Sequence, residues 1–154
     1  MSHDTGHNHP ERAERLRAVL DALTMPSMSV LDHREAPLAT LSQLTRVHSR
    51  AYIDQVLSTV PFSGHAYLDP DTVISPRSGE AARRAAGAVC GAVDAVMHGD
   101  ATRAFCATRP PGHHADPDHA MGFCIFNNVA VGVAHALVQY GIQRIAIVDF
   151  DVHH

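Results

Sequence analysis

The residues best suited to chemistry lie in two short segments of the second half of the chain. One contains the adjacent histidines His113 and His114, and the other is the run Asp-Phe-Asp-Val-His-His at 149–154. In an extended backbone, residues i and i+2 face the same side, so Asp151 and His153 can direct a carboxylate oxygen and an imidazole nitrogen at one cation. One oxygen and one nitrogen ligand suit zinc, with iron, cobalt or manganese as alternatives.

Asp149 lies two residues before Asp151, so in an extended backbone its side chain faces the same side as those of Asp151 and His153. It is expected to accept a hydrogen bond behind the metal ligands or to help hold another cation. A catalytic zinc normally has three protein ligands and one open position, and only two ligands are evident here. We therefore expect the third to be missing or supplied from elsewhere. The competing interpretation of this run is a turn held by hydrogen bonds from aspartate side chains to the backbone.

The pair His113 and His114 would lie beside such a metal. A metal-bound water needs a base to take its proton, and a leaving amine needs an acid, and one histidine can do both in sequence. The neighbouring imidazole can stabilise developing negative charge. Pro110, Pro111 and Gly112 stiffen and tighten the turn and so fix where the pair points. Taken alone, a histidine pair is more often a surface feature without function.

The elements that must position these residues follow a β-α-β pattern. Residues 103–107 are predicted to form a short strand, 125–140 a helix closed by Gly141, and 144–149 an apolar parallel strand covered on both faces. Such a unit is right-handed, and ligands bind beyond the carboxyl ends of its strands. Both histidine-bearing segments should therefore emerge at the same edge of the sheet.

The first half of the chain is expected to be helical. Apolar spacing predicts three helices, at about 16–23, 49–59 and 81–98. Ser78 is expected to cap the third helix. Residues 60–79 are rich in proline and glycine and are predicted to form a long structured loop. The first ten residues are polar, and His3 is assigned to a flexible tail.

Composition restricts the class of protein. The 154 residues suffice for one domain, and a net charge of −4 without blocks of like charge gives no indication of nucleic acid or membrane partners. No apolar run approaches the roughly 20 residues that cross a bilayer, and no signal-peptide layout is evident, so the cytoplasm is expected. The three cysteines form no C-x-x-C pair, which argues against a disulfide framework or a zinc knuckle.

Three late motifs together resemble the histone deacetylase and acetylpolyamine amidohydrolase family, in particular its bacterial and class II branch. They are RPPGHHA at 109–115, MGFCIFNN at 121–128 and DFDVHH at 149–154. Shorter pieces agree: HPE at 9–11, VHS at 47–49 and DPDT at 69–72. The resemblance implies an arginase/deacetylase-like three-layer α/β fold with a mainly parallel sheet. Residues 1–154 would then be the amino-terminal part of a single deacetylase domain, truncated after the Asp-x-Asp-x-His-His strand end.

The resemblance also implies the activity and the metal. The activity is zinc-dependent hydrolysis of an N-acetyl amide, with Zn2+ held by Asp151 and His153 and with Fe2+ or Co2+ as alternatives. A structural K+ is implied around Asp149, Asp151 and His153. The family's third zinc ligand, an aspartate, and its transition-state tyrosine would lie beyond this chain. We therefore expect the parent protein to deacetylate and this chain alone to be inactive.

For the remaining site residues, the resemblance assigns His114 as general base and acid and His113 as its electrostatic partner. It assigns Phe123 to the wall of the acyl-chain tunnel, with Gly122 beside it. Acetyl-lysine in a protein, an acetylated polyamine and another small N-acyl amine all fit as the acetylated amine substrate. The oligomeric state is not predicted.

Two other interpretations of the same motifs stay open. An arginase-type ureohydrolase shares the fold and uses two metals, but it would carry an Asp-x-His-x-Asp run, whereas His154 directly follows His153 here. The histidine pair also favours the deacetylase. The other alternative is a non-catalytic fragment or interaction module that retains the motifs without the activity.

Overall fold

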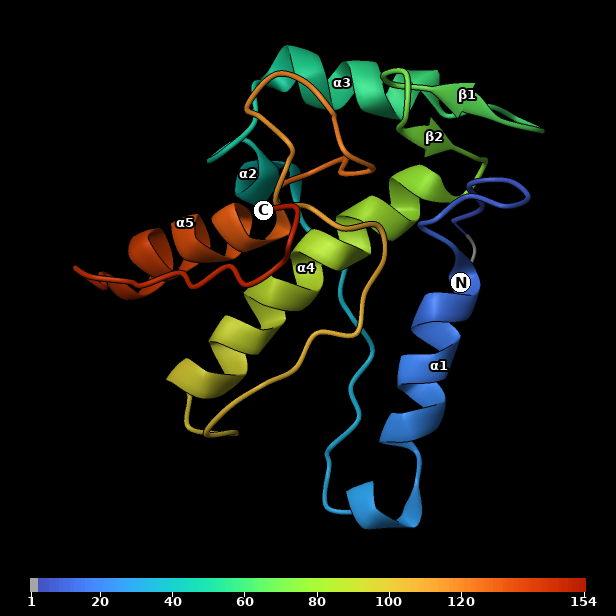
Figure 1. Cartoon of the computed structure of the whole chain (residues 1–154). Coiled ribbons are helices and arrows are strands. Elements are labelled where there is room, and N and C mark those ends of the chain that lie inside the picture. The colour runs from blue at the N-terminus through green and yellow to red at the C-terminus, as the bar shows by residue number, and fades with distance from the viewer. Residues whose placement is uncertain (1–2) are drawn as a thin grey trace.

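A long central helix organises the chain. The computed structural model describes residues 3–154, and α4 (Ser78–Met97) crosses its middle with α5 (Asn128–Tyr140) packed beside it (Figure 1). The other elements are α1 (Ala13–Leu23), the 3-10 helix η1 (Pro26–Met28), α2 (Leu41–Leu44), α3 (Arg50–Thr59), β1 (Ala66–Tyr67) and β2 (Val73–Ile74). None of the helices within residues 3–154 has both the length and the apolarity to cross a bilayer.

Small residues allow α4 to pack closely against α5 and against the extended segment around Pro37. A Cβ on Gly87 would lie 2.0 Å from the carbonyl oxygen of Pro37, so only glycine fits there. On α5, a Cβ on Gly132 would lie 2.3 Å from Val89 of α4. The second contact fixes the α4–α5 pair, which supports one side of the candidate site.

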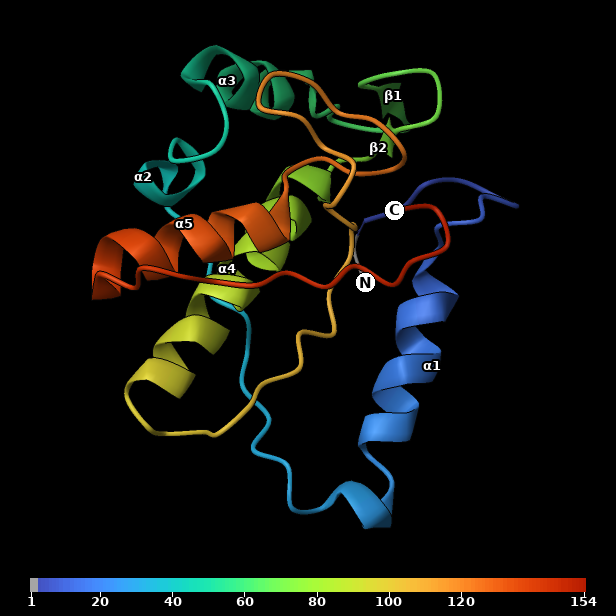
Figure 2. The ribbon, with the colours of Figure 1, turned by 60° about the vertical axis from the view of Figure 1, so that its left-hand side comes forward.

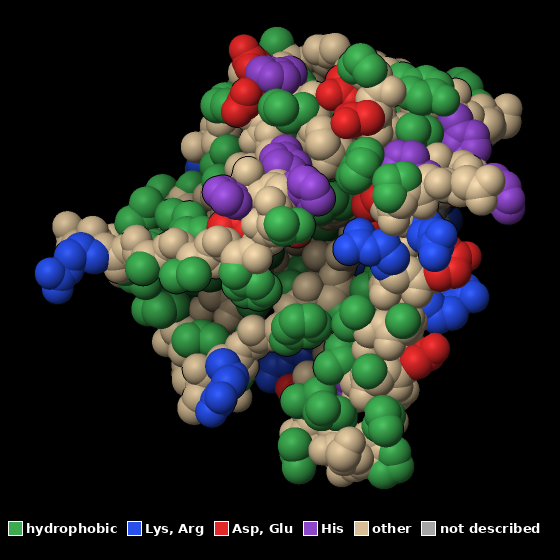
Figure 3. Space-filling view, in the orientation of Figure 1, with side chains coloured by type: hydrophobic (Ala, Val, Ile, Leu, Met, Phe, Trp, Pro, Cys, Tyr) green, Lys and Arg blue, Asp and Glu red, His purple; other side chains and the backbone are tan. Residues whose placement is uncertain are grey.

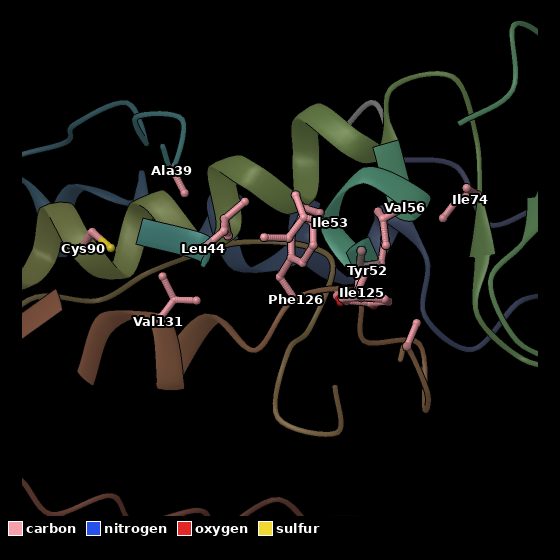
Figure 4. Packing of buried hydrophobic residues seen from close by; sticks show 13 residues of the cluster. Ala39, Leu44, Tyr52, Ile53, Val56, Ile74, Cys90, Ile125, Phe126 and Val131 are labelled. Carbon is pink, nitrogen blue, oxygen red and sulfur yellow. The ribbon is translucent and has the colours of Figure 1, made fainter. Parts of the chain in front are cut away.

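The hydrophobic core lies where α2, α3, β2 and α4 meet the residues that lead into α5 (Figure 4). Ile125 and Phe126 are fully buried there, immediately before α5 begins. The hydroxyl of Tyr52 donates a hydrogen bond of 2.6 Å to the carbonyl oxygen of Ile125. The core therefore fixes the entry to α5, namely the buried residues Ile125 and Phe126 that precede the helix.

Several predicted helix ends are confirmed. Ser49 caps α3 by accepting a hydrogen bond from the backbone nitrogen of Tyr52, at 3.2 Å. Gly141 follows α5 with a left-handed φ of 64°, which terminates the helix as predicted. α5 starts later than predicted because Asn127 is its cap and the two apolar residues before it belong to the core. α1 is present, although none of its residues is buried.

Three expectations for the first half are wrong. Ser78 is not a cap but the first residue of α4, and its Oγ accepts a hydrogen bond of 2.7 Å from the backbone of Ser75. Residues 60–79 are not only loop, because β1 and β2 pair there as an antiparallel hairpin. His3 is not in a flexible tail: it is 2% exposed, and its Nδ1 lies 2.7 Å from Ser78 Oγ.

The mainly parallel sheet is not found either. Residues 103–107 and 144–149 carry no strand, and the only sheet within residues 3–154 is the β1–β2 hairpin. Residues 143–154, hereafter the terminal segment, instead run back along α5 (Figure 2). A strand requires hydrogen-bonding neighbours, and these apolar segments find none here, so Val148 and Phe150 are 81% and 95% exposed.

Candidate functional site

Two asparagines at the start of α5 hold residues 109–115, hereafter the histidine-pair loop. Asn128 Nδ2 donates to the carbonyl oxygen of Pro110 at 3.2 Å, and Asn127 Nδ2 donates to those of His113 at 3.4 Å and Ala115 at 3.3 Å. Both asparagines belong to the MGFCIFNN motif but are not among the site residues predicted from the sequence. The available signal was a polar pair directly after a buried apolar run.

The turn predicted at Gly112 is confirmed, because the backbone nitrogen of Ala115 donates to the carbonyl oxygen of Gly112 at 3.1 Å. A Cβ at this position would lie 2.5 Å from the backbone nitrogen of Asn128 and 2.5 Å from the carbonyl oxygen of Phe126. The backbone of the loop therefore lies directly against the entry to α5. Because the core holds that entry, the histidine pair rests on a rigid support.

A buried ion pair fixes the start of the loop. Arg109 Nη2 donates to Glu11 Oε2 at 2.6 Å, its Nε donates to Oε1, and its Nη1 donates to the carbonyl oxygen of His3 at 3.1 Å. Burial would raise the pKa of Glu11, but hydrogen bonds from His3 and Arg109 and the charge of Arg109 lower this pKa to about 2. Sequence reasoning missed this pair because its members lie 98 positions apart.

The two histidines of the pair lie side by side, with ring centroids 4.2 Å apart and planes inclined by 50°. His113 Nδ1 lies 2.8 Å from Asp149 Oδ2. This hydrogen bond is the main reason that the pKa of Asp149 falls below its usual value. The histidine-pair loop and the terminal segment therefore meet as the β-α-β pattern predicted, although neither predicted strand forms.

Gly122 and Phe123 lie on the other side of the pair. A Cβ on Gly122 would be 2.5 Å from His114 Cδ2, so this position gives the ring its room. Phe123 has a left-handed φ of 67°, and its backbone nitrogen donates to Thr72 Oγ1 at 3.2 Å. Its ring meets that of His9 edge-on, with centroids 4.8 Å apart. The structure thus brings Gly122 against His114 and fixes the backbone of Phe123 next to it.

The predicted metal ligands are placed differently. The backbone nitrogen of Asp151 donates to Asp149 Oδ1 at 3.0 Å, and that of His153 donates to Asp151 Oδ1 at 2.9 Å. These are the aspartate turns of the competing interpretation. All three side chains belong to exposed residues. One carboxylate and one imidazole suit zinc in type, but within residues 3–154 no three histidine, cysteine or acidic side chains converge to hold a metal.

A groove of about 640 Å³ lies between the histidine-pair loop, the start of α5 and the terminal segment. His113, Asp149 and Asp151 line it together with apolar residues of the terminal segment and of the start of α5. In the space-filling view, histidine side chains gather on the face where the chain ends (Figure 3). The groove therefore carries one imidazole and two carboxylates on a partly apolar lining, and the ring of His114 lies beside that of His113. This arrangement places groups that can transfer a proton next to an apolar surface.

Known proteins are similar to this chain in both sequence and fold. The histone deacetylase domain family matches residues 9–154. The chain is 41% identical over 145 residues to the histone deacetylase-like amidohydrolase of Pseudomonas aeruginosa, covering 94% of this chain and 37% of that protein. It is 38% identical over 152 residues to the probable deacetylase of Methanothermobacter thermautotrophicus, covering 96% and 44%.

The crystal structure of the HDA15 HD domain matches with a TM-score of 0.81 and 34% identity, over 89% of this chain and 40% of that one. This likeness is consistent with the arginase/deacetylase fold. The chain thus spans between 37% and 44% of the length of these three relatives. Because the family match extends from the amino-terminal HPE motif to the final histidine, the chain belongs to the histone deacetylase domain family.

Proposed function

We propose that the protein to which this chain belongs hydrolyses N-acetyl amides, namely acetyl-lysine or acetylated polyamines, in a zinc-dependent reaction. The family supports the hydrolase class, since the relatives are named as deacetylases or amidohydrolases. The observation that carries the proposal is the 2.8 Å contact between His113 and Asp149, which brings the histidine pair to the aspartate-rich terminal segment.

The roles of the pair follow from its surroundings. His114 rests against Gly122. We assign to it the transfer of a proton from the attacking water to the leaving amine. The Nδ1 of His113 is held 2.8 Å from a carboxylate oxygen of Asp149, which fixes the orientation of its ring. We assign to it the stabilisation of negative charge on the former amide oxygen. We propose that Phe123 lines the site of the substrate's acyl chain, next to the histidine pair.

Asp151 and His153 are proposed to hold the zinc. Bound zinc would lower the pKa of a coordinated water to about 7 and polarise the acetyl carbonyl. A preformed three-donor site is absent from the described residues, so the isolated chain should bind zinc weakly. The resemblance also places the transition-state tyrosine beyond this chain. Losing one such donor to the oxyanion typically costs about 100–1,000-fold in rate. We therefore propose that this chain by itself is inactive.

The test compares this chain with a chimera in which residues 1–154 replace the matching region of the Pseudomonas amidohydrolase. We expect the chimera to hold about one zinc per chain and to release acetate from acetyl-lysine or an acetylated polyamine. His114→Ala should abolish turnover, and His33→Ala, an exposed histidine outside the site, should not. A zinc-loaded chimera without turnover, or one in which His114→Ala stays active, would contradict the proposal.

One observation favours a second candidate, the non-catalytic module. The aspartate turns at 149–153 occupy carboxylate oxygens with backbone hydrogen bonds, as a purely structural turn would. This candidate predicts that the chimera is folded and takes up no zinc at all. Metal analysis of the purified chimera therefore separates the two candidates before any substrate is tried.

A further inference from the structure

The amino-terminal strap (residues 3–11) reaches the start of the histidine-pair loop from the far end of the sequence. Arg109 binds both carboxylate oxygens of Glu11 and the carbonyl oxygen of His3. The side chains of Arg109 and Glu11 are only 6% and 2% exposed. A charge this deeply buried is strongly unfavourable without its partner, so the two groups hold each other in one place.

The strap is itself fastened to α4. His3 Nδ1 lies 2.7 Å from Ser78 Oγ, and the backbone nitrogen of Asp4 donates to Ser75 Oγ at 2.9 Å. His3 Nε2 lies 3.5 Å from Glu11 Oε2. His3 thus connects the first turn of the long central helix with the buried ion pair. The amino-terminal segment lies next to that end of α4 (Figure 1).

The connection continues from Arg109 to the histidine pair. Pro110, Pro111 and Gly112 separate Arg109 from His113, and the two prolines have a fixed φ. Pro110 is fully buried, and Gly112 has no room beside the entry to α5. A displacement of Arg109 is therefore passed on to His113 rather than absorbed by a flexible linker.

We propose that His3, Glu11 and Arg109 are positioning residues, through which the amino-terminal strap sets the orientation of the histidine pair. This inference rests on the proposed function for its catalytic consequence. None of the three lines the groove next to His113 and Asp149, so they act through the loop and not on the substrate. A misplacement of catalytic groups by about 1 Å can cost about 100-fold in rate.

The first experiment is hydrogen exchange of the 154-residue chain, because it does not depend on turnover. We expect Glu11→Gln and His3→Ala to speed exchange of the amides of residues 112–115 by at least about tenfold. Asp54→Asn, which removes the exposed Arg50–Asp54 pair, is the surface control. Ile53→Val, a conservative change in the core, controls for general loss of stability.

The second experiment measures kcat and KM in the chimera. Glu11→Gln and His3→Ala should lower kcat by about 10–100-fold while KM changes by less than about threefold, because the groups that bind the substrate are untouched. If Glu11→Gln fails to fold, the apolar pair Glu11→Leu with Arg109→Met replaces it. That double variant should fold and still show fast loop exchange.

Two results would overturn the inference. One is loop exchange in His3→Ala and Glu11→Gln, or in the apolar pair, that is no faster than in Ile53→Val. The other is a kcat that falls no more than in Ile53→Val. If the unmodified chimera shows no turnover, the proposed function fails, and the exchange data alone then decide whether the strap positions the loop.

Discussion

The histidine-pair loop and the terminal segment carry the two halves of the proposed chemistry, but they are held very differently. The loop is fixed by the buried Arg109–Glu11 pair and by two asparagines of α5. The terminal segment is exposed, and its polar residues are held by local aspartate turns and by the contact from Asp149 to His113. The proton-transfer groups are therefore preorganised in this chain, whereas the proposed metal ligands are not.

The contrast has a physical cause. The loop gains its order from polar groups that are buried and satisfied, so displacement would leave them unpaired. The terminal segment has the apolar sequence of a strand, but no neighbouring strand among residues 3–154 pairs with it. Apolar side chains such as Val148 consequently stay largely in water at the edge of the groove.

The largest expected effect comes from breaking the ion pair. Glu11→Ala leaves a buried guanidinium unpaired and should lower the free energy of unfolding by about 3–5 kcal/mol. Urea unfolding followed by circular dichroism measures this change. The double variant Glu11→Leu with Arg109→Met should be less destabilised than Glu11→Ala. Equal or greater destabilisation of the double variant would show that the pair contributes more than mutual neutralisation.

The pH dependence of stability tests the same pair. The pKa of Glu11 falls from 4.5 to about 2 on folding. The unfolded chain therefore binds more protons between these values, and the stabilisation is present above pH 4.5 and is lost as the pH falls towards 2. The loss should be about 3 kcal/mol. Glu11→Gln should lack this part of the pH dependence, and an unchanged acid profile in that variant would contradict the assignment.

A smaller effect is expected at the turn of the loop. Gly112→Ala places a Cβ against the backbone of α5's entry and should cost about 1–3 kcal/mol. Val148→Ala in the terminal segment should change stability by less than about 0.5 kcal/mol, because the side chain is 81% exposed. Thermal unfolding of both variants makes the comparison. Similar losses of stability in the two variants would contradict the difference between the histidine-pair loop and the terminal segment.

The smallest effect on stability is expected from Asp149→Asn. This change weakens the contact with His113 and the first aspartate turn, both of which are exposed. Unfolding should shift by less than about 0.5 kcal/mol. Crystal structures of the chimera with and without the change should show His113 reoriented and Arg109 unmoved. Movement of Arg109 would mean that the terminal segment also helps to hold the loop.

Local patterns were sufficient to predict much of the frame. The apolar spacing around Ile53 predicted α3, and a glycine after an apolar helix predicted the end of α5 at Gly141. The predicted meeting of the histidine pair and the aspartate run is also confirmed by the contact between His113 and Asp149, although the two parallel strands on which that prediction rested do not form within residues 3–154.

What failed depended on partners distant in sequence. The apolar run at 144–149 has the sequence pattern of a strand. Strand formation, however, requires neighbouring strands that this run does not itself specify. His3, Glu11 and Arg109 are ordinary polar residues until folding brings them together, and no local periodicity links positions 98 apart.

Hydrogen exchange of the unmodified 154-residue chain, read region by region, tests the central comparison most directly. We expect the backbone amide of Ala115, which donates to the carbonyl oxygen of Gly112, and the amides at the start of α5 to be protected, because they are hydrogen-bonded in an ordered part of the chain. We expect the amides of the terminal segment to exchange at nearly the rate of an unfolded peptide. Equal protection of the two regions, or greater protection of the terminal segment, would contradict the account.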